Sequence, residues 1–382
     1  MKHKCLPVVA VVLKMLMGVL FLISALAKLN AIDIFETYVY SFGLFSMTTS
    51  FFLSRIVIGL ELVLGVALIS NRHHRFTMLM TLLFLLCFIV FLTYAHLIGR
   101  SDSCHCFGEL LPFDPVQSIV KNAVLVLVLL FSFKYTPAEW SPRWWLVIIV
   151  YLLLAALMLA YYYFHLKVIF IFSFVMLAVC MAVSLLASFK FYRKWYVTAM
   201  LIAAPIVSVF ILSPPDNWMF SEGGGTYDSE LLVKQLSAPA EETMLAEPDS
   251  LSLDEGALAH LGFDSGRRLV ALFSPTCDYC SLAAQKICTI VERHHIDSAD
   301  VAYVFPVVKN KDSYNLFFEK SMSPRYNFTL IDKTLFVKIT RGSFPVVVLL
   351  EDGVVRHAFE YRNIDETVIA SFMNNKPNNT EK

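Results

Sequence analysis

The chain has 382 residues, of which 57% are hydrophobic and 16% are charged, so it is more apolar and less charged than an ordinary soluble domain. Its formal net charge is zero at pH 7, which leaves no excess of basic residues for binding nucleic acid. This composition excludes a wholly soluble protein and argues against a nucleic-acid partner. It predicts a protein of the lipid bilayer.

The first 213 positions hold seven apolar stretches that we expect to cross the membrane, because a helix of roughly 20 apolar residues spans the bilayer core. The stretches are 6–26, 52–69, 76–98, 118–133, 144–164, 168–189 and 195–212. Basic residues fall in every second connection between them, at Lys2, Lys4, Arg72, Arg75, Lys134, Arg143, Lys190, Arg193 and Lys194. Cation-rich connections face the cytoplasm, so we expect the N-terminus inside and the C-terminus outside. An alternative for the first stretch is a signal peptide with its apolar region at 15–27.

The composition changes after Leu212. Residues 214–255 combine Pro214-Pro215, the glycine run 223–225 and an acidic stretch rich in Ser, Pro and Glu, a pattern typical of a tether. We therefore expect four parts along the chain. They are a transmembrane bundle at 1–135, three additional spans at 136–213, a linker at 214–255 and a soluble domain at 256–376.

Apolar strands alternate with helical patterns from residue 267 onward. We expect strands at 269–273, 301–308, 346–350 and 354–359, the last two joined as a hairpin, and helices at 277–294, 314–322 and 364–373. The motif CDYC (277–280) follows the first strand and Phe344-Pro345 precedes the hairpin, so residues 254–374 resemble the thioredoxin fold. This resemblance implies a cis Pro345 that borders Cys277. The long spacing from Cys280 to Pro345 predicts an insertion at about 310–333.

The CDYC motif predicts a redox-active dithiol. Cys277 opens a helix, where unpaired N–H groups and the helix dipole stabilise a thiolate, so we expect it to be the nucleophile. Cys280 lies one turn further on the same face and is expected to resolve the mixed disulfide that forms. The alternatives for the pair are a structural disulfide and half of a zinc site.

A second cysteine pair lies between the third and fourth apolar stretches, in Ser103-Cys104-His105-Cys106-Phe107-Gly108. This CxCFG motif, with FLISALAK at 21–28 and ELVLG at 61–65, resembles the methylamine-utilisation MauE family, a relative of DoxX-type four-helix membrane proteins, over about residues 8–133. The resemblance implies a four-helix bundle and a role in maturing another protein. The expected fold is a polytopic α-helical membrane domain, with three further spans, followed by a thioredoxin-like α/β domain.

Both cysteine pairs fall on the external side in this topology, so they could exchange electrons. Cys104 and Cys106 can bond only in a tight ring, which makes their disulfide more oxidising, and a protonated His105 would favour thiolates there. Asp278 should disfavour the thiolate at CDYC, so we expect electrons to pass from CDYC to the loop pair. We expect no metal; the alternative is a metal held by the loop cysteines with His96.

Glu61 lies inside the second apolar stretch. An ionisable residue within a membrane span is costly and marks a candidate functional site, so we expect Glu61 to support the reaction in the membrane. Lys28 or Arg55 could pair with it, or His96 could share its proton. The alternative is a structural carboxylate that fixes helix packing.

Together these features predict a membrane-bound thiol–disulfide oxidoreductase of the bacterial inner membrane, with the thioredoxin-like domain on the periplasmic side. The expected partners are the lipid bilayer and either client proteins with cysteines or a redox partner protein. Thiol exchange requires no cofactor, and a quinone is the electron acceptor suggested by analogy with DsbB-like and vitamin K epoxide reductase-like enzymes. The alternative function is a maturation factor that scaffolds a client protein while the CDYC pair forms or rearranges its disulfides.

Reporter fusions at Lys194 and after Lys382 test the expected topology. We expect cytoplasmic reporter activity at Lys194 and external activity at the C-terminus, because every cation-rich connection then faces the cytoplasm. Cytoplasmic activity from the C-terminal fusion would separate the two cysteine pairs and remove the argument for electron exchange.

Overall fold

The structure, a computed structural model, describes residues 2–71, 73–99, 114–137, 140, 142–166, 171–188, 195–216, 227–236 and 266–374. Contacts divide the chain into two compact units, one of residues 1–38 and 51–214 and the other of residues 39–50 and 215–382. Cys104, His105 and Cys106 lie outside the described residues. The expected domain boundaries at 135, 213 and 255 stay predictions.

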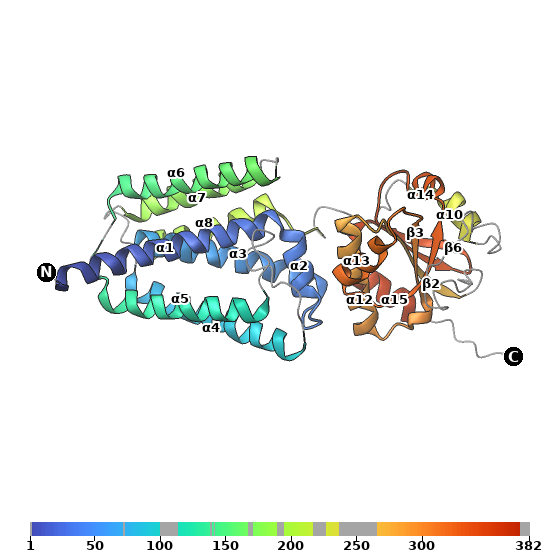
Figure 1. The fold of residues 1–382 in the computed structure, drawn as a ribbon, viewed down its shortest axis with the longest axis horizontal. Helices are drawn as coiled ribbons and strands as arrows, with labels where there is room; N and C mark the ends of the chain where they lie inside the picture. Colours follow the sequence, from blue (N-terminus) through green and yellow to red (C-terminus); the bar gives the residue numbers. More distant parts are fainter. Residues whose placement is uncertain are drawn as a thin grey trace. The chain divides into compact units, whose positions relative to one another are not determined.

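The described residues up to 212 form the helices seen in the blue to yellow-green part of Figure 1. They are α1 (Lys2–Asn30), α2 (Ile32–Tyr40), α3 (Met47–Ser70), α4 (His74–Leu97), α5 (Pro115–Tyr135), α6 (Trp144–Tyr161) with the π-helix η1 (Tyr162–Leu166), α7 (Ile171–Ser188) and α8 (Trp195–Leu212). Among the described residues, α1, α3, α4, α5 and α6 are long and apolar enough to cross a membrane by length and composition. The helical membrane domain is therefore confirmed. Spans at α7 and α8, which have 18 residues each, stay a prediction.

Helices α1 and α3 approach each other closely at two glycines. A Cβ atom on Gly18 would lie 2.9 Å from the carbonyl oxygen of Gly65, and a Cβ atom on Gly65 would lie 2.9 Å from the carbonyl oxygen of Gly18. Small residues at a crossing let membrane helices gain van der Waals contact between their backbones. A larger residue at either position would push the two helices apart, so the glycines determine how α1 meets α3.

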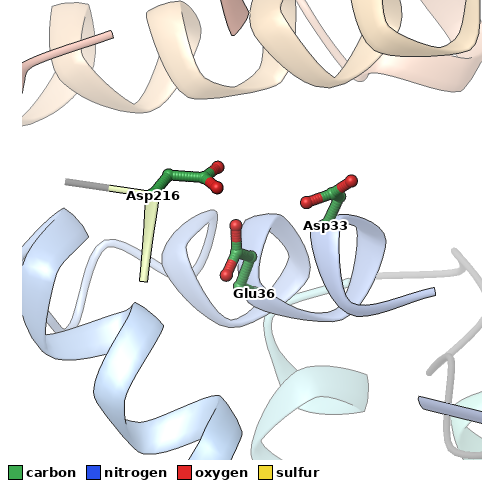
Figure 2. Close-up of side chains that lie close together, drawn as sticks. All are labelled: Asp33, Glu36 and Asp216. Atoms are coloured by element: carbon green, nitrogen blue, oxygen red, sulfur yellow. The ribbon is translucent and has the colours of Figure 1, made fainter. Parts of the chain in front are cut away.

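A buried arginine joins three segments of the first unit. Nη1 of Arg55, on α3, lies 2.9 Å from the carboxylate of Glu36 on α2. Figure 2 shows Glu36 together with Asp33, one turn earlier on the same helix. The guanidinium also donates hydrogen bonds to the carbonyl oxygens of Ser213 (2.7 Å) and Pro214 (2.9 Å), just after α8. Because a buried charge needs such partners, Arg55 ties α2 and α3 to the end of α8.

The second unit contains a five-stranded sheet with the strand order β4-β3-β2-β5-β6. Its strands are β2 (Arg267–Leu272), β3 (Val301–Pro306), β4 (Asn327–Ile331), β5 (Val346–Glu351) and β6 (Val354–Phe359). Its helices are α10 (Ser229–Leu236), α12 (Asp278–His294), α13 (Asp312–Ser321), α14 (Lys333–Thr340) and α15 (Glu366–Asn374), with 3₁₀ turns η3 (Ser298–Asp300) and η4 (Tyr361–Asn363). β2 pairs parallel with β3 and antiparallel with β5, which forms the hairpin with β6. This arrangement, with α12 directly after β2, confirms the thioredoxin-like fold.

Alternating side chains give the sheet two apolar faces. Val270 and Leu272 of β2 belong to one core together with Phe336 of α14. On the opposite face, the ring of Phe273 lies 5.5 Å from the ring of Phe317 on α13. The sheet is therefore covered by α10 and α14 on one face and by α12, α13 and α15 on the other (Figure 1).

The sequence patterns miss three elements of this unit, namely α10, β4 and α14. The helix α10 falls in the stretch expected to be a linker, yet Leu232 is buried in the core of the sheet, and the N–H of Asp228 donates to the carbonyl oxygen of Ile339 at 2.8 Å. The stretch expected to be a linker thus contains a packed helix, because polar and glycine-rich neighbours hide the apolar residues of this short helix. The expected insertion holds β4, which is a regular strand of the sheet, and the start of α14.

Leu232→Ala should destabilise the second unit by about 2–5 kcal/mol, as is typical when a buried leucine is shortened to alanine. Glu230→Ala, at an exposed position of the same helix, is the matched control and should change stability by less than about 0.5 kcal/mol. Urea unfolding of the full chain in detergent, followed by proteolysis of the C-terminal unit, measures both effects. Equal stability of the two variants would place α10 outside the folded domain.

Candidate functional site

The CDYC motif lies where β2 ends and α12 begins. The N–H of Phe273 donates to the carbonyl oxygen of Val304 at 2.9 Å, which extends the pairing with β3 by one residue, and the N–H of Cys277 donates to the carbonyl oxygen of Ser274 at 3.1 Å. Cys277 is the N-cap of α12 and has an extended backbone. The N–H groups of the first helical turn lack helical partners, so they are available to the Cys277 sulfur.

The two thiols of the motif have different surroundings. The partly exposed Cys277 sulfur accepts a hydrogen bond from the N–H of Cys280 at 3.3 Å, whereas the buried Cys280 sulfur accepts one from the N–H of Ser274 at 3.4 Å. A hydrogen bond from the Cys280 side chain, supported by first-turn N–H groups, lowers the pKa of Cys277 to about 7 against the opposing effect of burial. Burial, and then the neighbouring Cys277, raise the pKa of Cys280. Near neutral pH the thiolate is therefore on Cys277.

Asp278 affects this thiolate less than the sequence suggests. The Asp278 carboxylate raises the pKa of Cys277, but this effect is smaller than those of the hydrogen bonds that lower the same pKa. Nζ of Lys320, on α13, lies 2.5 Å from the Asp278 carboxylate, and both side chains are exposed. The expected direction of the Asp278 effect is confirmed, but the effect is small, because the hydrogen bonds to Cys277 outweigh it and a cation 42 residues further along the chain pairs with the carboxylate.

The Phe344–Pro345 peptide bond is cis, as the thioredoxin resemblance implies. Leu272 of β2 pairs with Val346 of β5, so Pro345 lies beside the end of β2 from which the CDYC turn emerges. At this edge Phe344 is 36% exposed and Tyr279, within the motif, is 43% exposed. The site therefore offers apolar surface to an approaching polypeptide.

Glu61 pairs with Lys28 within the membrane bundle. Nζ of Lys28 lies 2.9 Å from each carboxylate oxygen of Glu61 and donates a 2.7 Å hydrogen bond to Ser24. Both members of the pair are buried. Of the partners considered from the sequence, Lys28 is the one observed, while Arg55 binds Glu36.

His96 is exposed near the end of α4, and in the part of the chain that the structure describes it forms no hydrogen bond with Glu61.

Ser24 and Lys320 are partners that the sequence patterns do not identify. Ser24 precedes Lys28 by one helical turn, a spacing that could have indicated the contact. Lys320 is brought to Asp278 only by the packing of α13 against α12, which no local pattern reveals.

A cavity of about 30 Å³ adjoins Glu61 and is also lined by Lys28, Lys121, Asn122 and Phe88. This volume holds one or two water molecules and is too small for a quinone ring. The cavity at Glu61 therefore leaves no room for a quinone ring, and the quinone as an electron acceptor stays a prediction without a site.

Comparisons with known proteins bear on the two halves differently. Residues 6–135 match the model of the family described as methylamine utilisation protein MauE, which confirms the resemblance seen in the first spans and the cysteine loop. Protein TlpB of Flavobacterium psychrophilum is 36% identical over 130 residues, which cover 32% of this chain and 35% of that protein. The match thus spans about a third of the curated relative.

Among solved structures, the thioredoxin domain of a thiol-disulfide oxidoreductase from Bacteroides vulgatus is similar to 29% of this chain and 82% of its own, with 14% identity and a TM-score of 0.24. A similarity at this level carries no weight by itself. The thioredoxin-like fold rests instead on the strand order, the placement of α12 and the cis proline described above.

Alkylation of Cys277 should be half-maximal near pH 7, the pKa given by its hydrogen bonds. Lys320→Met should raise that midpoint by a few tenths of a pH unit in dilute buffer, since Asp278 would lose its neutralising partner, and molar salt should abolish the difference because the pair is exposed. Asp278→Asn is the control and should lower the midpoint. A midpoint for Lys320→Met equal to that of the unmodified chain in dilute buffer would show that the pair has no influence on the thiolate.

Proposed function

We propose that the protein is a membrane-bound thiol–disulfide oxidoreductase in which Cys277 is the nucleophile and Cys280 the resolving thiol. The observation that supports this most strongly is the contrast between the two sulfurs. Cys277 is accessible at a helix N-cap with its pKa lowered to about 7, whereas burial raises the pKa of Cys280. A thiolate attacks disulfides and a thiol does not, so the contrast supports Cys277 as the first thiol to attack.

The exchange runs in two steps that balance without a cofactor. The Cys277 thiolate attacks one sulfur of a substrate disulfide, and the other sulfur leaves as a thiolate that takes up a proton. Cys280 then gives up its proton and attacks Cys277, which releases the second substrate sulfur. The substrate disulfide gains two electrons and two protons, and Cys277 and Cys280 become a disulfide.

Within the chain, the substrate disulfide we propose is that of Cys104 and Cys106. The charge pattern of the connections supports a common external compartment, which would be the periplasmic side of a bacterial inner membrane. The tight ring of a CxC disulfide and the neighbouring His105 favour reduction of the loop by CDYC. Pro345, beside the CDYC turn, would present its backbone to the bound chain.

A second candidate function is a maturation factor for a client protein with cysteines. The observation that favours it is the exposed aromatic surface of Tyr279 and Phe344 at the edge of the site, which suits an extended client chain. The MauE match over residues 6–135 agrees with it, because that family is described by a metabolic pathway rather than by a reaction.

The variant Cys280→Ser separates the two functions, since loss of the resolving thiol should leave the mixed disulfide on Cys277 intact. We expect an internal cross-link to Cys104 or Cys106, visible when a protease site inserted after Gly224 is cut and the two halves stay joined until a reductant is added. Adducts with other proteins would instead support the maturation factor.

The control for this trap is the double variant Cys277→Ser/Cys280→Ser, which should form neither product. A trap that requires Cys280 in place of Cys277 would reverse the roles of the two thiols. The absence of both products in oxidising membranes would contradict the oxidoreductase itself.

A further inference from the structure

A lysine is buried in the helix that carries the CDYC motif. Lys286 lies on α12 and is 1% exposed. Burial of an ammonium group is costly unless other groups replace its water. Buried lysines are also rare in protein cores, so the contacts of Lys286 indicate its role.

The ammonium group of Lys286 is held by Tyr361, in the 3₁₀ turn η4. Nζ lies 3.8 Å from the centroid of the Tyr361 ring and donates a 3.4 Å hydrogen bond to the carbonyl oxygen of the same residue. A cation over an aromatic face is attracted by the ring quadrupole, most strongly where water is excluded. Tyr361 is itself buried, so the contact fixes the ring in the interior.

The same ring reaches the active-site turn. Its centroid lies 5.0 Å from that of Tyr279, with the planes inclined at 52°, a favourable distance for two aromatic side chains. Tyr279 stands between Cys277 and Cys280. Lys286, Tyr361 and Tyr279 thus form a continuous contact, here called the tyrosine bridge, from the interior of α12 to its first turn.

Acidic groups on the neighbouring elements are engaged by other cations. On α12 itself, Asp278 is paired with Lys320 at 2.5 Å. On α15, Glu366 is paired with Arg293 at 2.8 Å and with His294 at 3.0 Å. Arg362, on η4, is paired with Asp216 at 3.0 Å.

We propose that Lys286 is a positioning residue for the CDYC site, which acts through the tyrosine bridge to hold the first turn of α12 closed around Cys277. The N–H of Cys280 then stays at 3.3 Å from the Cys277 sulfur. Loosening of this turn would weaken the hydrogen bonds that stabilise the thiolate. The inference rests on the proposed oxidoreductase function for its purpose, although the geometry it concerns can be measured without any substrate.

Two variants of the full chain in detergent remove the bridge, namely Lys286→Met and Tyr361→Leu. Each should lower the rate of Cys277 alkylation at pH 6 by about threefold to tenfold, which corresponds to a midpoint higher by up to one pH unit. Each should also make the midpoint potential of the Cys277–Cys280 couple more negative, because the reduced form loses stabilisation. Mass spectrometry of the modified peptide separates Cys277 from the other cysteines.

Two conservative variants are the matched controls. Lys286→Arg keeps a cation under the ring, and Tyr361→Phe keeps both the ring and the backbone carbonyl, so both should retain the midpoint of the unmodified chain. If Lys286→Met fails to fold, Tyr279→Ser interrupts the bridge at an exposed position. A double variant of Tyr279→Ser with Tyr361→Leu should shift the midpoint no further than either change alone, as expected for members of one contact chain.

The proposal is overturned if Lys286→Met or Tyr361→Leu lowers the unfolding temperature but leaves the alkylation midpoint and the potential unchanged, because the residues would then be merely structural. It is also overturned if the Tyr279→Ser and Tyr361→Leu shifts add. Failure of the oxidoreductase function would appear separately, as the absence of mixed disulfides in the Cys280→Ser trap, while the alkylation experiment would still report on the bridge.

Discussion

The hydrocarbon core of a membrane offers no hydrogen-bond partners, so ionised groups there must satisfy one another. Among the described residues of the helical unit, the pair of Lys28 and Glu61, both on candidate spans, meets this constraint, and a second buried pair joins α3 to the short helix α2, which is not one of the candidate spans. Lys28 and Glu61 connect α1 to α3, and Arg55 and Glu36 connect α3 to α2 and, through the guanidinium, to the end of α8. The glycine contact between α1 and α3 adds close backbone packing to the same pair of helices. These polar contacts therefore add to the apolar packing of the helices and help to fix α1, α2 and α3 relative to one another.

In the thioredoxin-like domain, the partly buried sulfur of Cys277 likewise needs hydrogen-bond partners when it becomes charged. Backbone N–H groups at the N-cap of α12 meet the Cys277 thiolate, and burial keeps Cys280 protonated. Charged side chains around the motif contribute less, since Asp278 and Lys320 neutralise each other in solvent. The lowered pKa of Cys277 thus comes first from the hydrogen bond of the Cys280 side chain and then from backbone N–H groups of the first helical turn, so the elements that hold this turn matter as well as the residues of the motif.

Local patterns predict the elements that position the thiols, namely β2, α12 and the β5–β6 hairpin, and the resemblance to the thioredoxin fold implies the cis Pro345. They fail where the signal is short or non-local. α10 has only eight residues, with polar and glycine-rich neighbours, and β4 lies in a stretch without clear alternation. Contacts between distant residues, such as Lys320 with Asp278 or Lys286 with Tyr361, follow from helix packing that no spacing rule contains. Among the partners open to Glu61, only the helix geometry selects Lys28.

The packing of α10 against the sheet determines where a working fragment of the second unit has to begin. Leu232 of α10 lies in one core with Val270 and Phe336, and earlier in the chain Asp216 pairs with Arg362 at 3.0 Å. A fragment that begins at residue 256 would lack α10 and would expose to water the apolar surface that this helix covers on α14 and β6. Exposed apolar surface of this kind promotes aggregation, so the thioredoxin-like domain has to be produced from about residue 215, where the second unit begins.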